Sequence, residues 1–256
     1  MGRTLLSTIR DLQRRRGRER RGLAVAEGVR LVEEALAAAV PIRGAVVAPA
    51  LEATSRGKAL KAALLRAGVP LESLGDRTLA ALADTEHPQG VIAVVEPPRR
   101  TLEDIRPGPR GAVLVLDAVQ DPGNVGALVR TALGLGAAGL VALPGTADLS
   151  NPKALRGSMG ALFRLPCAAA DVPALLGWAA RSGVAIWTSG VDGSPVGSVR
   201  RRGPVALVVG NEGAGVHPAL ARAADATVAV PLAGPVESLN VAVAAGILLY
   251  EVLRDR

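Results

Sequence analysis

The sequence predicts an α/β protein whose larger, C-terminal part is built on a parallel sheet. Two observations carry this prediction. From residue 112 onward, short apolar runs alternate with stretches of helical spacing, and several runs are apolar throughout, such as VLVL (113–116) and VALVV (205–209). Strands that are apolar on both faces are typical of parallel sheets covered by helices on each side.

The first 96 residues predict a smaller α/β unit. Residues 1–22 form a basic lead-in, for which helix is one interpretation. After it, apolar spacing predicts helices and then short strands, and the ranges are 29–40, 57–67 and 76–83 for helices and 44–48 and 90–96 for strands. The stretch EPPRRTLEDIRPGPR (96–110) is rich in proline and charge, so we expect residues 97–110 to link this unit, residues 1–96, to a second domain over 111–256.

In the second domain, five apolar runs predict strands, at 112–117, 139–143, 184–189, 205–209 and 226–230. A long apolar helix from about Ser238 to Arg254 closes the chain. The sequence shows no internal repeat.

Composition bounds the function classes. Of the 256 residues, 49% are hydrophobic and 21% charged, enough for the core of one large or two smaller domains. No apolar run approaches the roughly 18 residues of a membrane span, and the N-terminus has no apolar stretch of signal-peptide length, so we expect a soluble, cytoplasmic protein without membrane association. One cysteine, Cys167, and two histidines exclude an intrachain disulfide and argue against a zinc site or any other bound metal.

The net charge is +7, and nearly all of the positive charge is arginine. A general bias toward arginine explains part of this excess, but it does not explain six arginines within eight residues: Arg14, Arg15, Arg16, Arg18, Arg20 and Arg21. Because the guanidinium fork matches phosphate oxygens in pairs, the cluster favours a nucleic-acid or other anionic partner. If the partner is RNA, we expect these side chains to contact its backbone.

GLGAAG (134–139) fits the dinucleotide fingerprint G-x-G-x-x-G. That fingerprint requires a strand before it and a helix after it, whereas here a helix precedes and a strand follows. We therefore interpret Gly134 and Gly136 as a helix C-terminus. This argues against a nucleotide-linked oxidoreductase, and no P-loop is present either.

The first polar loop follows the strand at 112–117. Asp121-Pro122-Gly123 predicts a tight turn at the carboxyl end of a parallel strand, where open α/β sheets place ligands. We expect Asn124 to open a helix on which Arg130, two turns on, needs an anionic partner or water. The alternative is that Asn124 is an ordinary N-cap and Arg130 extends to the surface.

Two further loops follow apolar strands. In GNEGAG (210–215), the glycines allow close approach to a ligand, and Glu212 is either a ligand-binding acceptor, a partner for an arginine, or a solvated side chain in a turn. In VPLAGPVESLNVAVA (230–244), we expect Ser238 to cap the last helix and Asn240 to lie in its first turn, where a polar amide among buried residues should be hydrogen-bonded.

DPGNVGALVRTA, GNEGAG and VPLAGPVESLNVAVA, in that order, resemble the three motifs of the SpoU (TrmH) class of SPOUT methyltransferases. NPKALRGSMGALFRLP (151–166) is similar to the segment that connects the first two motifs, and the front part is similar to a substrate-binding domain of that family. The resemblance implies a deep trefoil knot in the C-terminal domain, a feature too rare for periodicity to suggest. It also implies a homodimer.

The resemblance further implies transfer of a methyl group from S-adenosylmethionine to a ribose 2′-hydroxyl of RNA. Residues at the polar motif positions around the reaction centre would be Asn124, Arg130, Glu212, Ser238 and Asn240. Residues lining the S-adenosylmethionine site would be Gly210, Val230, Leu232 and Leu239, with Thr188 and Gly190 as weaker candidates.

Because a guanidinium keeps its proton, we expect Arg130 to fix the RNA phosphate and stabilise the developing alkoxide, while a phosphate oxygen or water takes the proton. His217, in HPAL, is a weaker candidate for the base, since it is more typical of a helix start. The front domain favours large-subunit rRNA over tRNA as substrate. A non-catalytic RNA-binding protein on the same fold is the remaining alternative.

Overall fold

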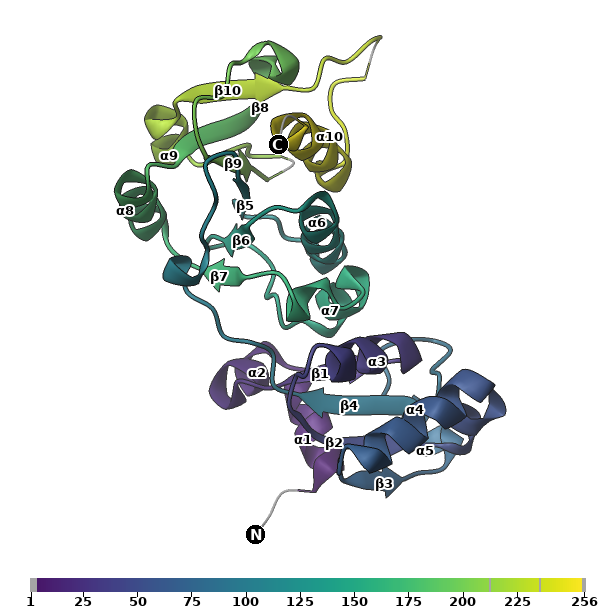
Figure 1. Cartoon of the computed structure of the whole chain (residues 1–256). Helices are drawn as coiled ribbons and strands as arrows, with labels where there is room; N and C mark the ends of the chain where they lie inside the picture. The colour runs from purple at the N-terminus through teal and green to yellow at the C-terminus, as the bar shows by residue number, and fades with distance from the viewer. Residues whose placement is uncertain (1–3, 212, 235, 255–256) are drawn as a thin grey trace. The chain divides into compact units, whose positions relative to one another are not determined.

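A computed structural model describes residues 4–211, 213–234 and 236–254. The chain divides into two compact units, which Figure 1 shows. One comprises residues 1–98 together with 148–163, and the other comprises 99–147 and 164–256. Each unit is described by itself.

The first unit is built on a four-stranded mixed sheet in the order β1-β4-β2-β3. Its strands are β1 (Ala24–Glu27), β2 (Ile42–Val47), β3 (Leu71–Ser73) and β4 (Val91–Val95). Its helices are α1 (Leu5–Leu12), α2 (Arg15–Arg21), α3 (Val29–Ala37), α4 (Ser55–Arg66), α5 (Asp76–Ala80) and α7 (Pro152–Ser158), with 3₁₀ turns η1 (Pro49–Ala53) and η3 (Ala161–Phe163). One core of this unit packs Ile9 and Leu12 of α1 and Leu79 of α5 onto side chains of the sheet.

The expected helices and strands of this unit are confirmed within a few residues, and the basic lead-in forms the two short helices α1 and α2. Glycine at position 17 of α2 allows α2 to approach the end of α1 closely, because a Cβ on Gly17 would lie 2.0 Å from the carbonyl oxygen of Asp11. The sequence pattern did not predict β1 and β3, since four or three residues are too few to show a period.

The second unit is built on a six-stranded sheet in the order β10-β8-β9-β5-β6-β7, in which every neighbouring pair is parallel. Its strands are β5 (Ala112–Leu116), β6 (Gly139–Ala142), β7 (Cys167–Ala169), β8 (Ala185–Pro195), β9 (Val205–Val209) and β10 (Ala226–Ala229). Its helices are α6 (Pro122–Leu135), α8 (Val172–Ser182), α9 (Pro218–Ala223) and α10 (Val241–Leu253), with 3₁₀ turns η2 (Leu102–Asp104) and η4 (Val196–Ser198). The predicted parallel sheet is confirmed.

Helices cover both faces of this sheet, as Figure 1 shows. Leu175 and Trp178 of α8 and Leu220 of α9 pack with sheet residues in one core. On the other face, α6 and α10 lie side by side against the central strands. This two-sided burial explains why β5 and β9 are apolar at every position. The trefoil knot implied by the resemblance stays a prediction.

Three local expectations are corrected. Helix α6 begins at Pro122 and not at Asn124, because Asp121 is the N-cap and its Oδ1 accepts from the Asn124 N–H over 2.8 Å. Helix α10 begins at Val241 and not at Ser238, because Asn240 supplies the cap. Leu102 and Ile105 of the expected linker are buried in the core of the second unit.

The interpretation of GLGAAG as a helix end is confirmed. Gly136 adopts the left-handed conformation (φ 72°) that terminates α6, and its N–H bonds to the carbonyls of Ala132 and Leu133. Gly134 is still within the helix.

Candidate active site

Two of the expected reaction-centre residues, Asn124 and Asn240, lie in direct contact. The Nδ2 of Asn240 donates a hydrogen bond to Oδ1 of Asn124 over 3.2 Å. Asn124 lies in the first turn of α6, where Asp121 and not Asn124 does the capping. The first and third motifs are thus joined at one point.

Asn240 does more than the sequence predicted. It lies not inside the first turn among buried residues but at the exposed N-cap of α10, where its Oδ1 accepts from the Ala242 N–H over 2.9 Å. Both the donor and the acceptor of the Asn240 side-chain amide are therefore hydrogen-bonded. Ser238, expected as the cap, lies exposed in the preceding loop.

Arg130 is exposed on α6, six residues beyond Asn124, or roughly 9 Å along the helix axis. Within the described part of the chain, no hydrogen bond or ion pair involves its side chain. The neighbouring Leu128 and Val129 are buried. The Arg130 guanidinium is therefore available to an external anion, while the backbone of Arg130 is fixed by the packing of α6.

The loop after β9 closes tightly on itself. A Cβ on Gly210 would lie 2.4 Å from the backbone of Gly215, so only glycine permits this closure. Asn211 and Gly215 exchange two backbone hydrogen bonds, of 3.1 and 2.9 Å. Glu212, which the sequence predicted to act here, lies outside the described residues. Asn211 was not singled out from the sequence, although its position beside Glu212 in a glycine-rich loop could have been a signal.

The loop 231–239 has the properties of a ligand-binding segment. Among its described residues, none donates a backbone hydrogen bond to another described residue. Leu232 and Val236 are large apolar side chains that are 39% and 54% exposed, whereas Leu239 and Val230 are half-buried. Free backbone groups beside exposed apolar side chains suit a planar heterocycle with polar edges.

Of the weaker candidates, Thr188 is 2% exposed, and its hydroxyl lies 3.1 Å from that of Thr227 in the neighbouring strand. Gly190 lies just beyond it, where a Cβ would approach Thr227 to 3.2 Å. The structure gives Thr188 a partner within the sheet, which argues against a ligand contact through its side chain.

His217 is a helix-start residue, as its sequence context indicated. Its Nδ1 accepts from the Ala219 N–H over 3.1 Å at the N-terminus of α9. A ring nitrogen engaged in capping is poorly placed to take a proton from a substrate.

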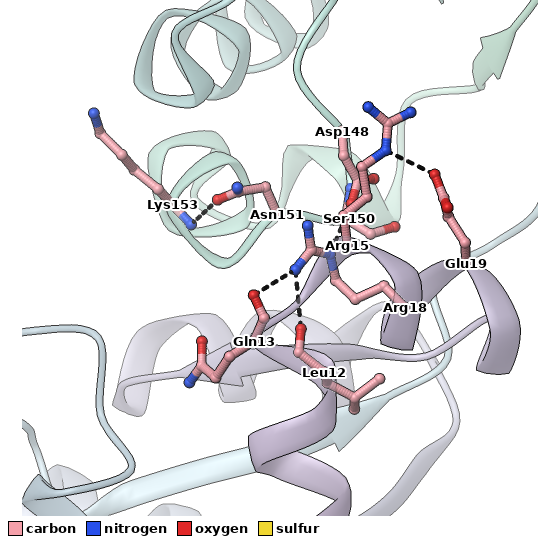
Figure 2. Close-up of polar contacts among 9 residues, drawn as sticks. All are labelled: Leu12, Gln13, Arg15, Arg18, Glu19, Asp148, Ser150, Asn151 and Lys153. Atoms are coloured by element: carbon pink, nitrogen blue, oxygen red, sulfur yellow. Dashed lines mark hydrogen bonds and ion pairs between the residues drawn. The ribbon is translucent and has the colours of Figure 1, made fainter.

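The arginine cluster at 14–21 is not one uniform surface. Figure 2 shows Arg18 turned inward: its Nε lies 2.7 Å from Asp148, and its Nη1 donates to the carbonyls of Leu12 and Gln13, each over 3.0 Å. Arg18 is only 5% exposed. It therefore has a structural role, and its burial argues against the RNA contact expected of it.

The other cluster members are on the surface of the first unit, and three have partners. Arg20 and Arg21 both bond to Asp11, which lowers the pKa of that carboxyl to about 2, and Arg15 pairs with Glu19 over 2.7 Å. Arg14 and Arg16 are exposed, and no ion pair within the described residues involves them. These two are the arginines most accessible to an anion.

Two features are absent from the described residues. No helix there is long and apolar enough to span a membrane. No group of three or more His, Cys, Asp or Glu side chains is arranged to hold a metal ion.

Comparison with known proteins agrees with this geometry. Residues 111–250, more than half of the chain, match the model of the SpoU rRNA Methylase family, and residues 6–93 match the MRM3-like substrate binding domain. The chain therefore belongs to the SpoU rRNA methylase family.

Several relatives are similar over nearly their whole length. The 23S rRNA (guanosine(2553)-2′-O)-methyltransferase RlmP of Bacillus subtilis is 35% identical over 95% of this chain and 93% of its own. An AdoMet-bound rRNA methyltransferase from Sinorhizobium meliloti is 31% identical, with a TM-score of 0.87 over 98% of this chain and 94% of that chain. The SpoU methyltransferase AviRb from Streptomyces viridochromogenes, in complex with AdoMet, is 31% identical, with a TM-score of 0.86 over 99% and 98%.

Proposed function

We propose that this protein transfers a methyl group from S-adenosylmethionine to a ribose 2′-hydroxyl of RNA, and that its substrate is large-subunit ribosomal RNA. The observation that carries the proposal is the contact of Asn124 with Asn240, which joins the first and third family motifs on the helix that also carries the exposed Arg130. The rRNA substrates named for RlmP and the Sinorhizobium enzyme support the choice of RNA. We further propose that the protein acts in the cytoplasm, which the rRNA substrate named for the bacterial relative RlmP supports.

The loop 231–239 fits S-adenosylmethionine. Its free backbone groups can satisfy the polar edge of the adenine, and the exposed Leu232 can cover the face of the ring. We assign Gly210, Val230 and Leu239 to the same site by the family motifs. When bound, the donor supplies an activated methyl on a sulfonium, which leaves as the neutral thioether.

The residues of the chain have three tasks in this proposal. Arg130 holds the RNA phosphate in its fork and stabilises the negative charge that develops on O2′. Asn124, fixed by Asn240, orients the ribose or Arg130. We assign Glu212 to hold an arginine, and we assign Ser238 to the polar residues around the reaction centre. The hydroxyl proton passes to a phosphate oxygen or water, because the guanidinium of Arg130 keeps its own proton and cannot accept another.

RNA contacts outside the reaction centre fall to the first unit in this proposal. Arg14 and Arg16 are the exposed, unpaired members of the cluster, with Arg15, Arg20 and Arg21 able to exchange their carboxylate partners for phosphates. Such contacts position RNA without reading its sequence, and they weaken steeply with salt.

We further propose a homodimer. Helix α10 presents three large apolar side chains at helical spacing, Val243, Ile247 and Tyr250, which are 52%, 39% and 55% exposed. An apolar stripe of this kind on a folded unit is typical of an interface. Sedimentation equilibrium should give a dimer for the wild type and a monomer for Ile247→Asp; a monomeric wild type would contradict the proposal.

The proposed reaction is tested by transfer of labelled methyl from S-adenosylmethionine to total RNA that lacks the modification, with wild type and Arg130→Ala. Label in large-subunit rRNA that the variant loses would support the proposal. Label in tRNA would retain the chemistry and overturn the substrate. Absence of both transfer and S-adenosylmethionine binding would favour a non-catalytic RNA-binding protein on this fold.

A further inference from the structure

The loop after β9 is held at both ends by two consecutive residues that follow β5. Near its end, the N–H of His217 donates to Oδ2 of Asp117 over 2.6 Å, and Asp117 is only 6% exposed. At its start, Nδ2 of Asn211 donates to the carbonyl oxygen of Ala118 over 3.1 Å. The second motif is thus fastened to the segment that leads into the first.

The Asn211 side chain uses both halves of its amide. Its Oδ1 accepts from the N–H groups of Gly213 and Ala214, over 2.8 and 3.0 Å, while its Nδ2 bonds across to Ala118. A backbone N–H can only donate and a carbonyl oxygen can only accept, so these three partners fix which way the amide points. A side chain that accepts from its own loop and donates to another acts as a tie.

The residue that receives this tie has an unfavourable backbone conformation. Ala118 has φ 56°, in the left-handed region that residues with a Cβ seldom adopt. Gly145 lies next to the Cβ of Ala118, and only glycine fits there, because a Cβ on Gly145 would lie 2.9 Å from it. Conformations of this kind persist where surrounding contacts impose them, and they are common next to functional sites.

From these contacts we infer that Asn211 is a positioning residue for methyl transfer, which holds Gly210 and the backbone of Gly213 and Ala214 in register with the segment leading to Asn124. This inference rests on the proposed function. Asn211 acts through the backbone of Gly213, Ala214 and Ala118, and it needs no contact with RNA or methyl donor.

Two variants separate the cross-loop tie from the turn within the loop. Asn211→Ala removes both. Asn211→Asp keeps an oxygen that accepts from Gly213 and Ala214 but replaces the donor to Ala118 with a second oxygen, which cannot donate. Asp171→Ala is the control, because it also removes one side-chain to backbone bond, to the Ala174 N–H at the start of α8, away from the site.

For each variant, the experiment measures kcat and KM for S-adenosylmethionine, the Kd of S-adenosylmethionine by calorimetry, and the midpoint of urea unfolding. Because both Asn211 variants lose the hydrogen bond to Ala118, we expect both to lose roughly tenfold to a hundredfold in kcat/KM, beyond any loss explained by unfolding, while Asp171→Ala keeps wild-type kinetics. Wild-type kinetics in Asn211→Asp would overturn the inference, as would losses that match the unfolded fraction. A wild-type protein that neither binds the donor nor methylates RNA would overturn the proposed function, and the inference with it.

Discussion

The side-chain amide of Asn240 links two helices through a residue 116 positions away in the chain, because it donates to Asn124 of α6 while it caps α10. A single side chain therefore fixes where α10 begins and which surface of α6 it meets. The same residue would be an ordinary cap if α6 did not carry an asparagine in its first turn.

This double role makes Asn240→Ala informative. The lost cap should lower the free energy of unfolding by about 1 kcal/mol. Asp171→Ala, which removes the cap of α8, should cost a similar amount. Only Asn240→Ala should also lower kcat for methyl transfer, because Asn124 loses its partner. Urea unfolding and steady-state kinetics on the two variants check this, and equal kinetics would refute a functional role for the Asn124 contact.

Arg130 should be sensitive to the shape of its side chain as well as to its charge. Arg130→Ala should lower kcat roughly 100-fold to 1,000-fold, as loss of one oxyanion donor does. Arg130→Lys keeps the charge but loses the fork, so it should recover only a small part of the activity. Stability should change by less than about 0.5 kcal/mol, because the side chain is exposed.

Arg181→Lys, on an exposed arginine of α8, is the matched control and should leave turnover unchanged. Near-full turnover in Arg130→Lys would show that charge alone suffices, and the phosphate fork would have to be abandoned.

The arginine cluster should separate into a structural and an RNA-binding member. Arg18→Ala removes the cation that pairs with the Asp148 carboxylate and the N–H donor to the carbonyls of Leu12 and Gln13. This substitution should therefore cost about 3–5 kcal/mol of stability. Arg16→Ala should leave stability nearly unchanged and reduce the salt dependence of RNA binding, log K against log salt, by about one unit of slope. Binding titrations at several salt concentrations, beside urea unfolding, test both; an unstable Arg16→Ala or a stable Arg18→Ala would reverse the assignment.

Asp11 should titrate far below an ordinary aspartate. Hydrogen bonds from Arg21 and then Arg20 lower its pKa to about 2. A depressed pKa in the folded state means that the contribution to stability is present above the ordinary carboxyl pKa near 3.8 and is lost as the pH falls toward 2. Carboxyl NMR titration should show this value, and Arg21→Gln should raise it. A pKa near 4 in the wild type would exclude this arrangement of α1 and α2.

Gly134 and Gly210 should respond oppositely to substitution by alanine. Gly134 lies inside α6 with open space around it, so Gly134→Ala should stabilise the protein by roughly 0.5–1 kcal/mol without loss of activity. Gly210→Ala would place a Cβ 2.4 Å from Gly215 and should abolish methyl transfer by opening the loop. Loss of activity in Gly134→Ala would revive a ligand role for GLGAAG.

The sequence was most informative where burial alone determines which residue types can occur. The fully apolar runs at 113–116 and 205–209 predicted the parallel sheet, because both faces of β5 and β9 are buried. Short strands such as β7 were missed, since three residues carry no period. Helix starts were displaced because aspartate, serine and asparagine are all good caps, and only the observed bonds of Asp121 and Asn240 decide among them.

The sequence predicted individual residues of the site but not the hydrogen bonds between them. Motif positions singled out Asn124 and Asn240, yet nothing in the order of residues indicated that their amides would meet. The inward turn of Arg18 toward Asp148 depends on a pairing 130 positions apart, so charge counting could only assign the whole cluster to RNA. Asn211 was missed because its partners are backbone groups, which every residue carries.

The central claim is that the methyl group goes to a ribose 2′-hydroxyl of RNA, and the nature of the labelled product tests it most directly. Alkaline cleavage of RNA requires a free 2′-hydroxyl, so RNA labelled by the wild-type protein should release its label in alkali-resistant dinucleotides. Label recovered in mononucleotides would place the methyl group on a base and contradict the account.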